Sequence, residues 1–411
     1  MTNAANPGSS SNRILKLLIF LMFAAFAMTT DSVGTVIPSI IKEFQLGLTA
    51  AGSFHYATMS GIGISALFLG FLADRLGRKW TILIGLGLFG LSSAAFAVGH
   101  DFTLFVVLLF LSGLGIGIFK SAALALIGDI TGSTREHAST MNLVEGFFGT
   151  GAIIGPAIVA YSIQQGASWK WVYLIAAMLC LVLIAGMVAT PVRRHEVRAE
   201  APASAGQSLA LLRDPATWII GVALMLYVGA EAAIYVWAPT YFTGYDGSLA
   251  VLAGYVVSIF FVLRAAGRFV GAWLLARHDW KRVIAICSTG MAALFVIALI
   301  GGRDVAAVAL PATGIFMSVI YPTLNSTGIS CFERDRHGSI AGLLLFFTCV
   351  SAVLAPLAMG VVGDLFGTEY TIVLGGLFAV ALALLALWTL RRDPLGARLD
   401  ARNQSIPSEA H

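Results

Sequence analysis

Charged side chains that lie deep within long apolar runs are the part of this sequence best suited to chemistry. They are Asp31, Lys120, Glu145, Glu231 and Arg264. A charge at the centre of a lipid bilayer costs at least about 2.5–3.5 kcal/mol, so each should face a cavity or an opposite charge. A carboxylate in such a place can carry a proton, and we expect this role for Asp31, Glu145 and Glu231.

Polar and aromatic residues lie near these charges at helical spacing. Tyr227, Glu231 and Tyr235 are four positions apart, so a helix places a carboxylate between two phenols on one face. Asn142 and Glu145, three positions apart, share a face in the same way. Hydrogen-bonding groups beside flat apolar surface suit a small polar solute such as a sugar. The predicted substrate-binding residues are Asp31, Lys120, Asn142, Glu145, Tyr227, Glu231, Tyr235, Trp237, Tyr321 and Asn325.

The same residues also have purely structural interpretations. Asp31 could belong to a packing or gating contact, and Glu231 could form a structural ion pair with Arg264 or Lys120. The aromatic side chains could be ordinary residues of the membrane interface. His55 is the one histidine within an apolar run, and a pH-sensing role for it stays open.

The composition shows which elements must hold these residues. The chain has 411 residues, of which 58% are hydrophobic and 11% charged, with a mean hydropathy of +0.88. A soluble domain has about 25% charged residues, so this chain could not cover a water-exposed surface. The composition excludes soluble, disordered, nucleic-acid-binding and disulfide-scaffold proteins, and since the four cysteines lie in or beside apolar runs we expect no disulfide.

Twelve apolar runs are long enough to cross a bilayer, which takes about 20 helical residues. They cover about 15–40, 52–72, 81–99, 103–128, 138–162, 171–190, 217–241, 248–275, 283–301, 305–330, 339–361 and 370–390. A polar stretch over 192–216 divides them into six and six. The predicted fold is an all-α polytopic membrane protein with 12 transmembrane helices in two six-helix bundles. Its expected parts are a tail (1–14), a bundle (15–191), a central loop (192–216), a second bundle (217–390) and a tail (391–411).

Lysines and arginines are unevenly distributed over the loops. With the N-terminus inside, only three of the 25, Lys42, Lys170 and Arg303, fall in loops on the outer side. The positive-inside rule therefore predicts that both termini and the central loop are cytoplasmic. We expect a multi-pass protein of the cell inner membrane.

The loop after the second apolar run carries the most specific motif. Residues 70–79 read GFLADRLGRK, and a degenerate copy follows the eighth run from Gly271. The first copy resembles the signature loop G-x-L-A-D-R-x-G-R-K of the major facilitator superfamily. That resemblance implies two parallel bundles and a cytoplasmic gate that breaks and reforms. The predicted gate residues are Gly70, Asp74, Arg75, Gly77 and Arg78, with Arg268 near the inner end of the eighth run.

Three shorter segments narrow the resemblance. Residues 227–237 read YVGAEAAIYVW, residues 314–323 read GIFMSVIYPT, and Thr30 precedes Asp31. Together they resemble the fucose–galactose–glucose proton symporter branch of the superfamily. The resemblance implies proton-coupled hexose uptake by alternating access, with Asp31 taking the proton. Lys120 stands where that branch commonly has a glutamate, so Glu145 or Glu231 could be the second carboxylate.

Other functions stay open at this point. Lys120 and Arg264 could hold the carboxylate of a small organic anion. A drug/proton antiporter is disfavoured because residues 159–160 are Val-Ala where the antiporter motif has glycines. A sensor that has lost transport is a further alternative. Because no nucleophile–base pair, phosphate loop or metal-ligand set stands out, we expect no enzyme, metal or cofactor. The expected partners are a small-molecule substrate, a proton or sodium ion, and the lipid bilayer, with no nucleic acid and no second subunit.

Overall fold

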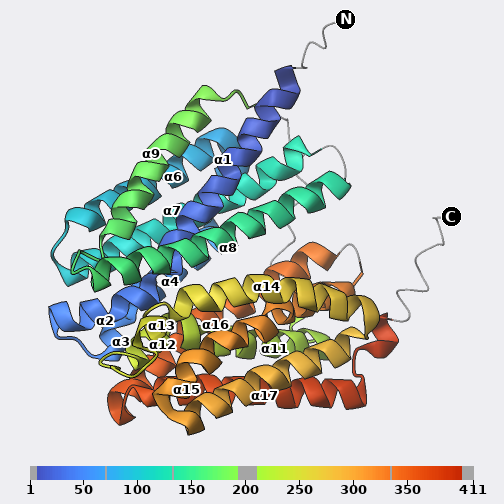
Figure 1. Ribbon diagram of the computed structural model, residues 1–411. Coiled ribbons are helices and arrows are strands. Elements are labelled where there is room, and N and C mark those ends of the chain that lie inside the picture. Colours follow the sequence, from blue (N-terminus) through green and yellow to red (C-terminus); the bar gives the residue numbers. More distant parts are fainter. Residues whose placement is uncertain (1–6, 70–71, 132–133, 193–210, 334–335, 400–411) are drawn as a thin grey trace, which may run out of the picture. The chain divides into compact units, whose positions relative to one another are not determined.

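The computed structural model describes residues 7–69, 72–131, 134–192, 211–333 and 336–399 (Figure 1). Within these ranges the regular secondary structure is helical. The chain divides into two compact units, residues 1–199 and 200–411. Since each unit packs around its own helices, each is described by itself.

In the first unit the long helices pack against two or more neighbouring helices each. Its elements are α1 (Pro7–Thr30), α2 (Val33–Phe44), α3 (Leu48–Ala51), α4 (Ser53–Phe68), α5 (Leu72–Arg75), α6 (Arg78–Val98), α7 (Phe102–Ile130), α8 (Thr134–Gln164) and α9 (Trp171–Ala189). Helix α1 packs against α8 and α9, while α7 packs against α4 and α6 (Figure 1).

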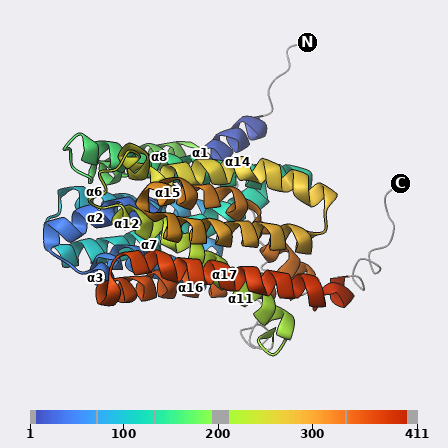
Figure 2. The same cartoon turned by 60° about the horizontal axis from the view of Figure 1, so that its bottom comes forward.

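The second unit repeats this plan. Its elements are α11 (Pro215–Ala232), the π-helical turn η1 (Ala233–Trp237), α12 (Ala238–Tyr241), α13 (Ala250–Gly254), α14 (Val256–Arg277), α15 (Trp280–Ser330), α16 (His337–Phe366) and α17 (Glu369–Arg392). Helices α11, α16 and α17 run side by side, and α15 packs against α14 and α17 (Figure 2).

Twelve spans account for the two units, as the sequence predicts. Ten helical segments of the described chain are long and apolar enough to cross a membrane. One of these ten is α15. Helix α15 has 51 residues but is interrupted at Gly302, whose φ of 73° is not helical, so it supplies two spans. Helix α4, with 16 residues, supplies the remaining span. Each unit then has six.

Several boundaries differ from the predicted runs. Helix α1 begins at Pro7, well before residue 15, because a helix can continue beyond the apolar stretch into polar residues. The run over 248–275 is not one helix, since α13 ends at Gly254 and α14 begins at Val256. At the far end α17 continues to Arg392, and Leu395 beyond it is only 1% exposed.

Glycines let the helices of the first unit meet backbone to backbone. A Cβ atom added to Gly115 on α7 would lie 2.7 Å from the Gly85 carbonyl oxygen and 2.8 Å from the Phe89 nitrogen on α6. Since lipid tails are as apolar as leucine, such close packing replaces the hydrophobic effect as the attraction between membrane helices. These contacts make a rigid frame for the charged residues.

Candidate functional site

The first helix of unit 1 is broken at Asp31. Helix α1 ends at Thr30 and α2 begins at Val33. The carboxylate oxygen Oδ2 of Asp31 accepts a hydrogen bond of 3.0 Å from the Thr30 hydroxyl, and the side chain is 9% exposed. Residues 29–32 read TTDS, and such short polar side chains compete with the helix for backbone partners. The sequence therefore places a buried carboxylate where the helix is interrupted.

Helix α8 closes around this break through a glycine. A Cβ atom on Gly155 would lie 2.5 Å from the Ser32 hydroxyl oxygen and 2.7 Å from the Met28 carbonyl carbon. The Ser32 hydroxyl in turn donates to the Met28 carbonyl oxygen. Any larger residue at position 155 would push α8 away from the break, which explains the glycine at this position.

Lys120 brings a positive charge against the same helix. Its ammonium lies 5.3 Å from the ring centre of Phe26 and 5.9 Å from that of Phe23, both on α1. A cation over an aromatic face gains about 0.5–2 kcal/mol, more when water is excluded. Unit 1 thus combines a buried carboxylate with a half-buried ammonium on neighbouring helices.

The other two predicted residues of unit 1 lie on the surface of the unit. Asn142 and Glu145 are on α8, and both side chains are exposed. They precede Gly155, the residue that contacts the break, by 13 and 10 positions. They share a helix face as predicted, but they do not belong to the buried cluster around Asp31.

In unit 2 the buried carboxylate has a direct counter-charge. Glu231 near the end of α11 forms an ion pair with Arg264 on α14, and Glu231 is 9% exposed. The Arg264 guanidinium also lies 5.9 Å from the Phe261 ring centre. Of the two structural partners considered for Glu231, the structure selects Arg264. The charge of Arg264 is therefore compensated within its own unit.

Aromatic side chains surround this ion pair. Tyr227, one turn before Glu231, is fully buried, and its ring centre lies 5.9 Å from that of Tyr321 on α15. Tyr321 and Asn325 are half-buried and one turn apart on α15, while Tyr235 is buried in η1. The structure therefore brings Tyr227, Glu231 and Tyr321 together. Helical spacing predicted the first two, but it could not place Tyr321, which lies on another helix.

Trp237 closes the π-helical turn and is completely enclosed. Its side chain is 0% exposed, and its ring N–H donates a 3.1 Å hydrogen bond to the carbonyl oxygen of Pro356 on α16. A sugar could not stack on this ring in the observed arrangement. Nothing in the sequence indicated that Pro356 would accept this hydrogen bond. Pro156 and Pro356 are 200 positions apart, and so are Asp31 and Glu231.

Part of the predicted gate lies outside the described residues, namely Gly70 and the side chain of Asp74. Gly77 has a φ of 83° and makes the sharp turn into α6. The Nε atom of Arg78 lies 3.2 Å from an oxygen of Asp129 at the end of α7, a partner that the sequence did not indicate. Arg75 on α5 and Arg268 on α14 are exposed.

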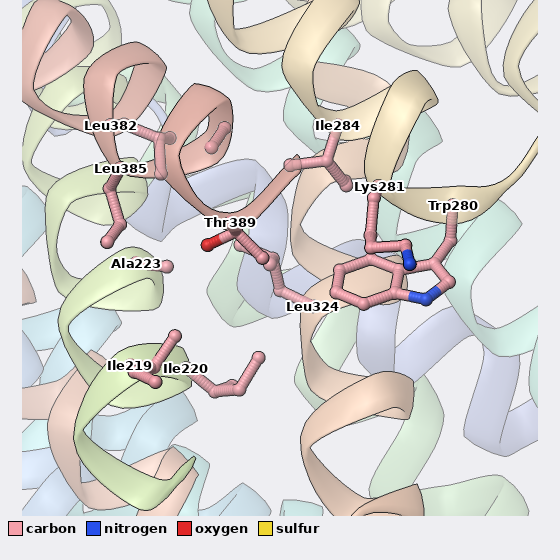
Figure 3. Close-up of a pocket in the computed structure, with 11 residues that line it drawn as sticks. Ile219, Ile220, Ala223, Trp280, Lys281, Ile284, Leu324, Leu382, Leu385 and Thr389 are labelled. Atoms are coloured by element: carbon pink, nitrogen blue, oxygen red, sulfur yellow. The ribbon is translucent and has the colours of Figure 1, made fainter. Parts of the chain in front are cut away.

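A crevice in unit 2 is lined by none of the predicted site residues (Figure 3). Its polar side chains are Trp280, Lys281 and Thr389, and the rest are aliphatic: Ile219, Ile220, Ala223, Ile284, Leu324, Leu382, Leu385 and Ala386. Because so few polar groups line it, the crevice does not suit a sugar. In the described parts of the chain no three His, Cys, Asp or Glu side chains gather as a metal site would need.

Comparison with known proteins gives a consistent result. The family model described as Major Facilitator Superfamily matches residues 18–356. The L-fucose-proton symporter of Escherichia coli (strain K12) is 26% identical over 400 residues, which cover 88% of this chain and 89% of the symporter. Protein TsgA of Escherichia coli O6:K15:H31 is 26% identical over 332 residues, covering 78% of this chain and 81% of that protein.

Solved structures resemble the whole chain. The nucleoside transporter NupG matches with a TM-score of 0.76 at 14% identity, covering 91% of this chain and 99% of NupG. A D-xylose-proton symporter matches with a TM-score of 0.73 at 15% identity, covering 91% and 96%. The Escherichia coli fucose:proton symporter FucP matches with a TM-score of 0.62 at 22% identity, covering 93% and 99%. Identities this low show a shared fold.

Proposed function

The chain belongs to the major facilitator superfamily and is a secondary transporter of the membrane, and from this premise we propose that it takes up a hexose together with protons. The observation that carries the proposal is the buried Asp31 at the break between α1 and α2. The similarity to the L-fucose-proton symporter over 88% of the chain supports both the sugar and the proton.

A carboxylate at a broken helix can couple a proton to transport. The protonated form of Asp31 is neutral, so it crosses an occluded, water-poor state at little cost, whereas the ionised form must be compensated. The Thr30 hydroxyl lies 3.0 Å from Oδ2 of Asp31 and 3.1 Å from the Phe26 carbonyl oxygen, and it stabilises the ionised form of Asp31 when its proton points to Oδ2. In the proposal, Asp31 loads and releases its proton as the transporter opens in turn to the two sides of the membrane.

Glu231 has a different role in this proposal. Its ion pair with Arg264 compensates its charge in this structure, so in the proposal Glu231 serves to tie α11 to α14 beside Tyr227. Asn142, Glu145, Tyr321 and Asn325 remain proposed sugar contacts because their side chains are exposed or half-buried. Hydroxyl groups of a hexose need such amides, carboxylates and phenols.

The topology and partners belong to the same proposal. Both termini and the segment 192–216 are cytoplasmic, the bundles span the inner membrane over 15–191 and 217–390, and the protein acts as a monomer. The uneven distribution of lysine and arginine supports this orientation. The coupling ion is the proton, with sodium as the variant that a gradient experiment distinguishes.

One observation favours a second candidate, a carrier for a small organic anion. Lys120 places an ammonium against Phe23 and Phe26, and a neutral sugar has no need of it. Arg264 does not strengthen this candidate since Glu231 already compensates its charge. The two functions therefore differ in what Lys120 does.

A ligand screen on purified protein separates the two candidates. L-fucose, D-galactose, D-glucose, lactate and succinate would each be added to the wild type and to Lys120→Met, and the melting temperature recorded. A ligand at 100 times its Kd stabilises by about 2.7 kcal/mol, which is a measurable shift. We expect shifts with a hexose in both proteins, smaller in the variant because, under the hexose proposal, Lys120 pairs with a carboxylate that Lys120→Met would leave uncompensated.

Stabilisation by acids alone, lost in Lys120→Met, would replace the sugar with an organic anion. Transport is then measured in proteoliposomes with the ligand that bound. Binding without any transport would identify a sensor, and outward movement of cationic drugs would identify an exporter.

A further inference from the structure

We propose that Trp237 is a positioning residue for transport. Its side chain ties the π-helical turn η1, which follows α11, to the proline turn of α16, and this tie holds Glu231 and Tyr235 in place. This goes beyond the proposed function, because it concerns the helix geometry and holds for any substrate. The tie is the hydrogen bond from the indole N–H of Trp237 to the Pro356 carbonyl oxygen.

Each of the two joined helices is weak at the level of the tie. Residues Ala233–Trp237 form a π-helical turn, which inserts an extra residue and interrupts the regular ladder of hydrogen bonds. Pro356 lies inside α16 and has no N–H to donate to the preceding turn. Either helix alone could bend here, so their relative position needs another contact to define it.

Two side-chain hydrogen bonds supply that contact on both sides of Glu231. The Ser351 hydroxyl on α16 donates to the Met225 carbonyl oxygen on α11 at 2.6 Å. Trp237 donates to Pro356 at 3.1 Å, and its ring is 0% exposed. Glu231 lies six positions after Met225 and six before Trp237. The segment that carries the carboxylate is therefore fixed to α16 at both ends.

Helix α17 supports the same segment from another direction. A Cβ atom on Gly375 would collide with the Cβ atom of Ala233, the first residue of η1. A Cβ atom on Gly229 would lie 2.7 Å from the Phe378 ring. The π-helical turn is thus held sterically by α17 and by directed hydrogen bonds to α16. In a low-dielectric interior, directed hydrogen bonds to backbone carbonyls specify one arrangement.

Hydrogen exchange of the full-length protein in nanodiscs of E. coli polar lipid tests the tie without a substrate. Trp237→Phe keeps a flat apolar ring and removes the N–H donor. We expect peptides over 233–241 and 352–360 to exchange about tenfold faster, the effect of losing one hydrogen bond of this kind. Ser351→Ala removes the other bond and should accelerate the same two peptides by a smaller factor.

The matched control is Trp218→Phe. Trp218 lies on the same helix, and its ring N–H also donates to a backbone carbonyl, that of Leu212 at 2.7 Å, but its side chain is 48% exposed. We expect wild-type exchange in both peptides for this variant. Wild-type exchange of 352–360 in both Trp237→Phe and Ser351→Ala would overturn the proposal, as would equal effects from Trp218→Phe.

A rescue variant distinguishes positioning from simple packing. Pro356→Ala restores the missing backbone donor and straightens α16, so Trp237→Phe in that background should no longer accelerate 352–360. Since Pro356→Ala keeps the carbonyl that accepts the indole N–H, an unchanged acceleration would show that Trp237 does not act by compensating the weak turn at Pro356, and would overturn that part of the proposal.

Uptake of radiolabelled L-fucose adds a functional measurement. Trp237→Phe should lower the uptake rate at least about fivefold and leave the fucose Kd within about twofold. Loss of binding with unchanged exchange would contradict positioning. If the wild type takes up no fucose, the proposed hexose function fails, whereas the exchange results still decide the role of Trp237.

Discussion

The two units each carry a buried carboxylate close to the end of their first helix and hold it in different ways. Asp31 and Glu231 are two hundred positions apart, as are Pro156 and Pro356 in the helices that pack against them. Asp31 lies in a break and receives a hydroxyl hydrogen bond from Thr30. Glu231 lies before a continuous π-helical turn and pairs with Arg264.

The packing around the two carboxylates differs correspondingly. In unit 1 the contact to the broken helix is made by Gly155, which leaves no room for a side chain. In unit 2 the residue before Pro356 is Ala355, and the indole of Trp237 bridges the helices there. The comparison teaches that the two buried carboxylates have different surroundings: Asp31 lies beside the Thr30 hydroxyl at a helix break, whereas Glu231 is held in an ion pair with Arg264.

The largest effect should come from removing the charge of Asp31. Asp31→Asn imitates the protonated form permanently, so it should abolish accumulation against a gradient while exchange across the membrane persists. Proteoliposomes with an imposed pH gradient measure both, as uphill uptake and as counterflow. Glu231→Gln should retain some uphill uptake if the two carboxylates differ as described.

Uphill uptake that survives in Asp31→Asn and disappears in Glu231→Gln would reverse the assignment of the two units. Wild-type uptake that follows a sodium gradient and ignores pH would keep the role of Asp31 but replace the proton.

The second effect concerns the stability of unit 2. Removing one partner of a buried ion pair leaves a charge uncompensated and costs about 3–5 kcal/mol. Glu231→Gln and Arg264→Gln should therefore each lower the melting temperature clearly, and the double variant should be less affected than the sum of the two. Glu145→Gln is the control, since that carboxylate is exposed on α8, and should change the melting temperature little. Additive losses would show that the pair contributes no coupling.

The smallest effect concerns surface ion pairs of the two compared helices. On α1 the Lys16 ammonium lies 2.6 Å from Glu136, which is 45% exposed. At the start of α11 the Arg398 guanidinium donates to both oxygens of Asp214, at 2.8 and 2.7 Å. Burial opposes the ionised form of Asp214, but Arg398 and the Ala216 backbone N–H hold the pKa of that carboxyl below its usual range.

A carboxyl whose pKa is lowered by folding stabilises the protein at neutral pH, and that contribution is lost as the pH falls through the folded-state pKa. Arg398→Gln should therefore destabilise by at most about 1 kcal/mol at pH 7, and the difference from the wild type should shrink below about pH 4. Melting temperatures between pH 3.5 and 8 measure this. Lys16→Gln, which removes a single contact to Glu136 where Arg398 contacts both oxygens of Asp214, should cost less, and a larger loss there would contradict the comparison.

Much of the fold was predictable because hydropathy is a local property. Each span must meet the bilayer by itself, so apolar runs of about 20 residues indicated the helices one by one. The motif at residues 70–79 predicted membership of the major facilitator superfamily, and the family match over residues 18–356 confirms it. Helix ends such as Pro7 and Arg392 were missed since polar residues can extend a helix beyond the bilayer.

The candidate site was predictable only in part. Spacing placed Tyr227, Glu231 and Tyr235 on one helix, and composition marked Asp31 as a costly charge. Trp237 was expected beside the substrate, yet its indole is enclosed and bonded to Pro356. The sequence of one helix does not indicate which neighbouring helix will supply the acceptor for the hydrogen bond of a tryptophan indole.

By itself the sequence determined the membrane location, the twelve spans, the division into two units and the set of intramembrane charges, because each follows from the local cost of placing a side chain in lipid. The tertiary structure alone decided which charges meet. Glu231 near the end of α11 and Arg264 on α14 are 33 positions apart, and the fold of the second unit brings their side chains into an ion pair. Lys120 instead lies against the rings of α1. Partner choice depends on contacts between segments far apart in the chain, which only packing brings together.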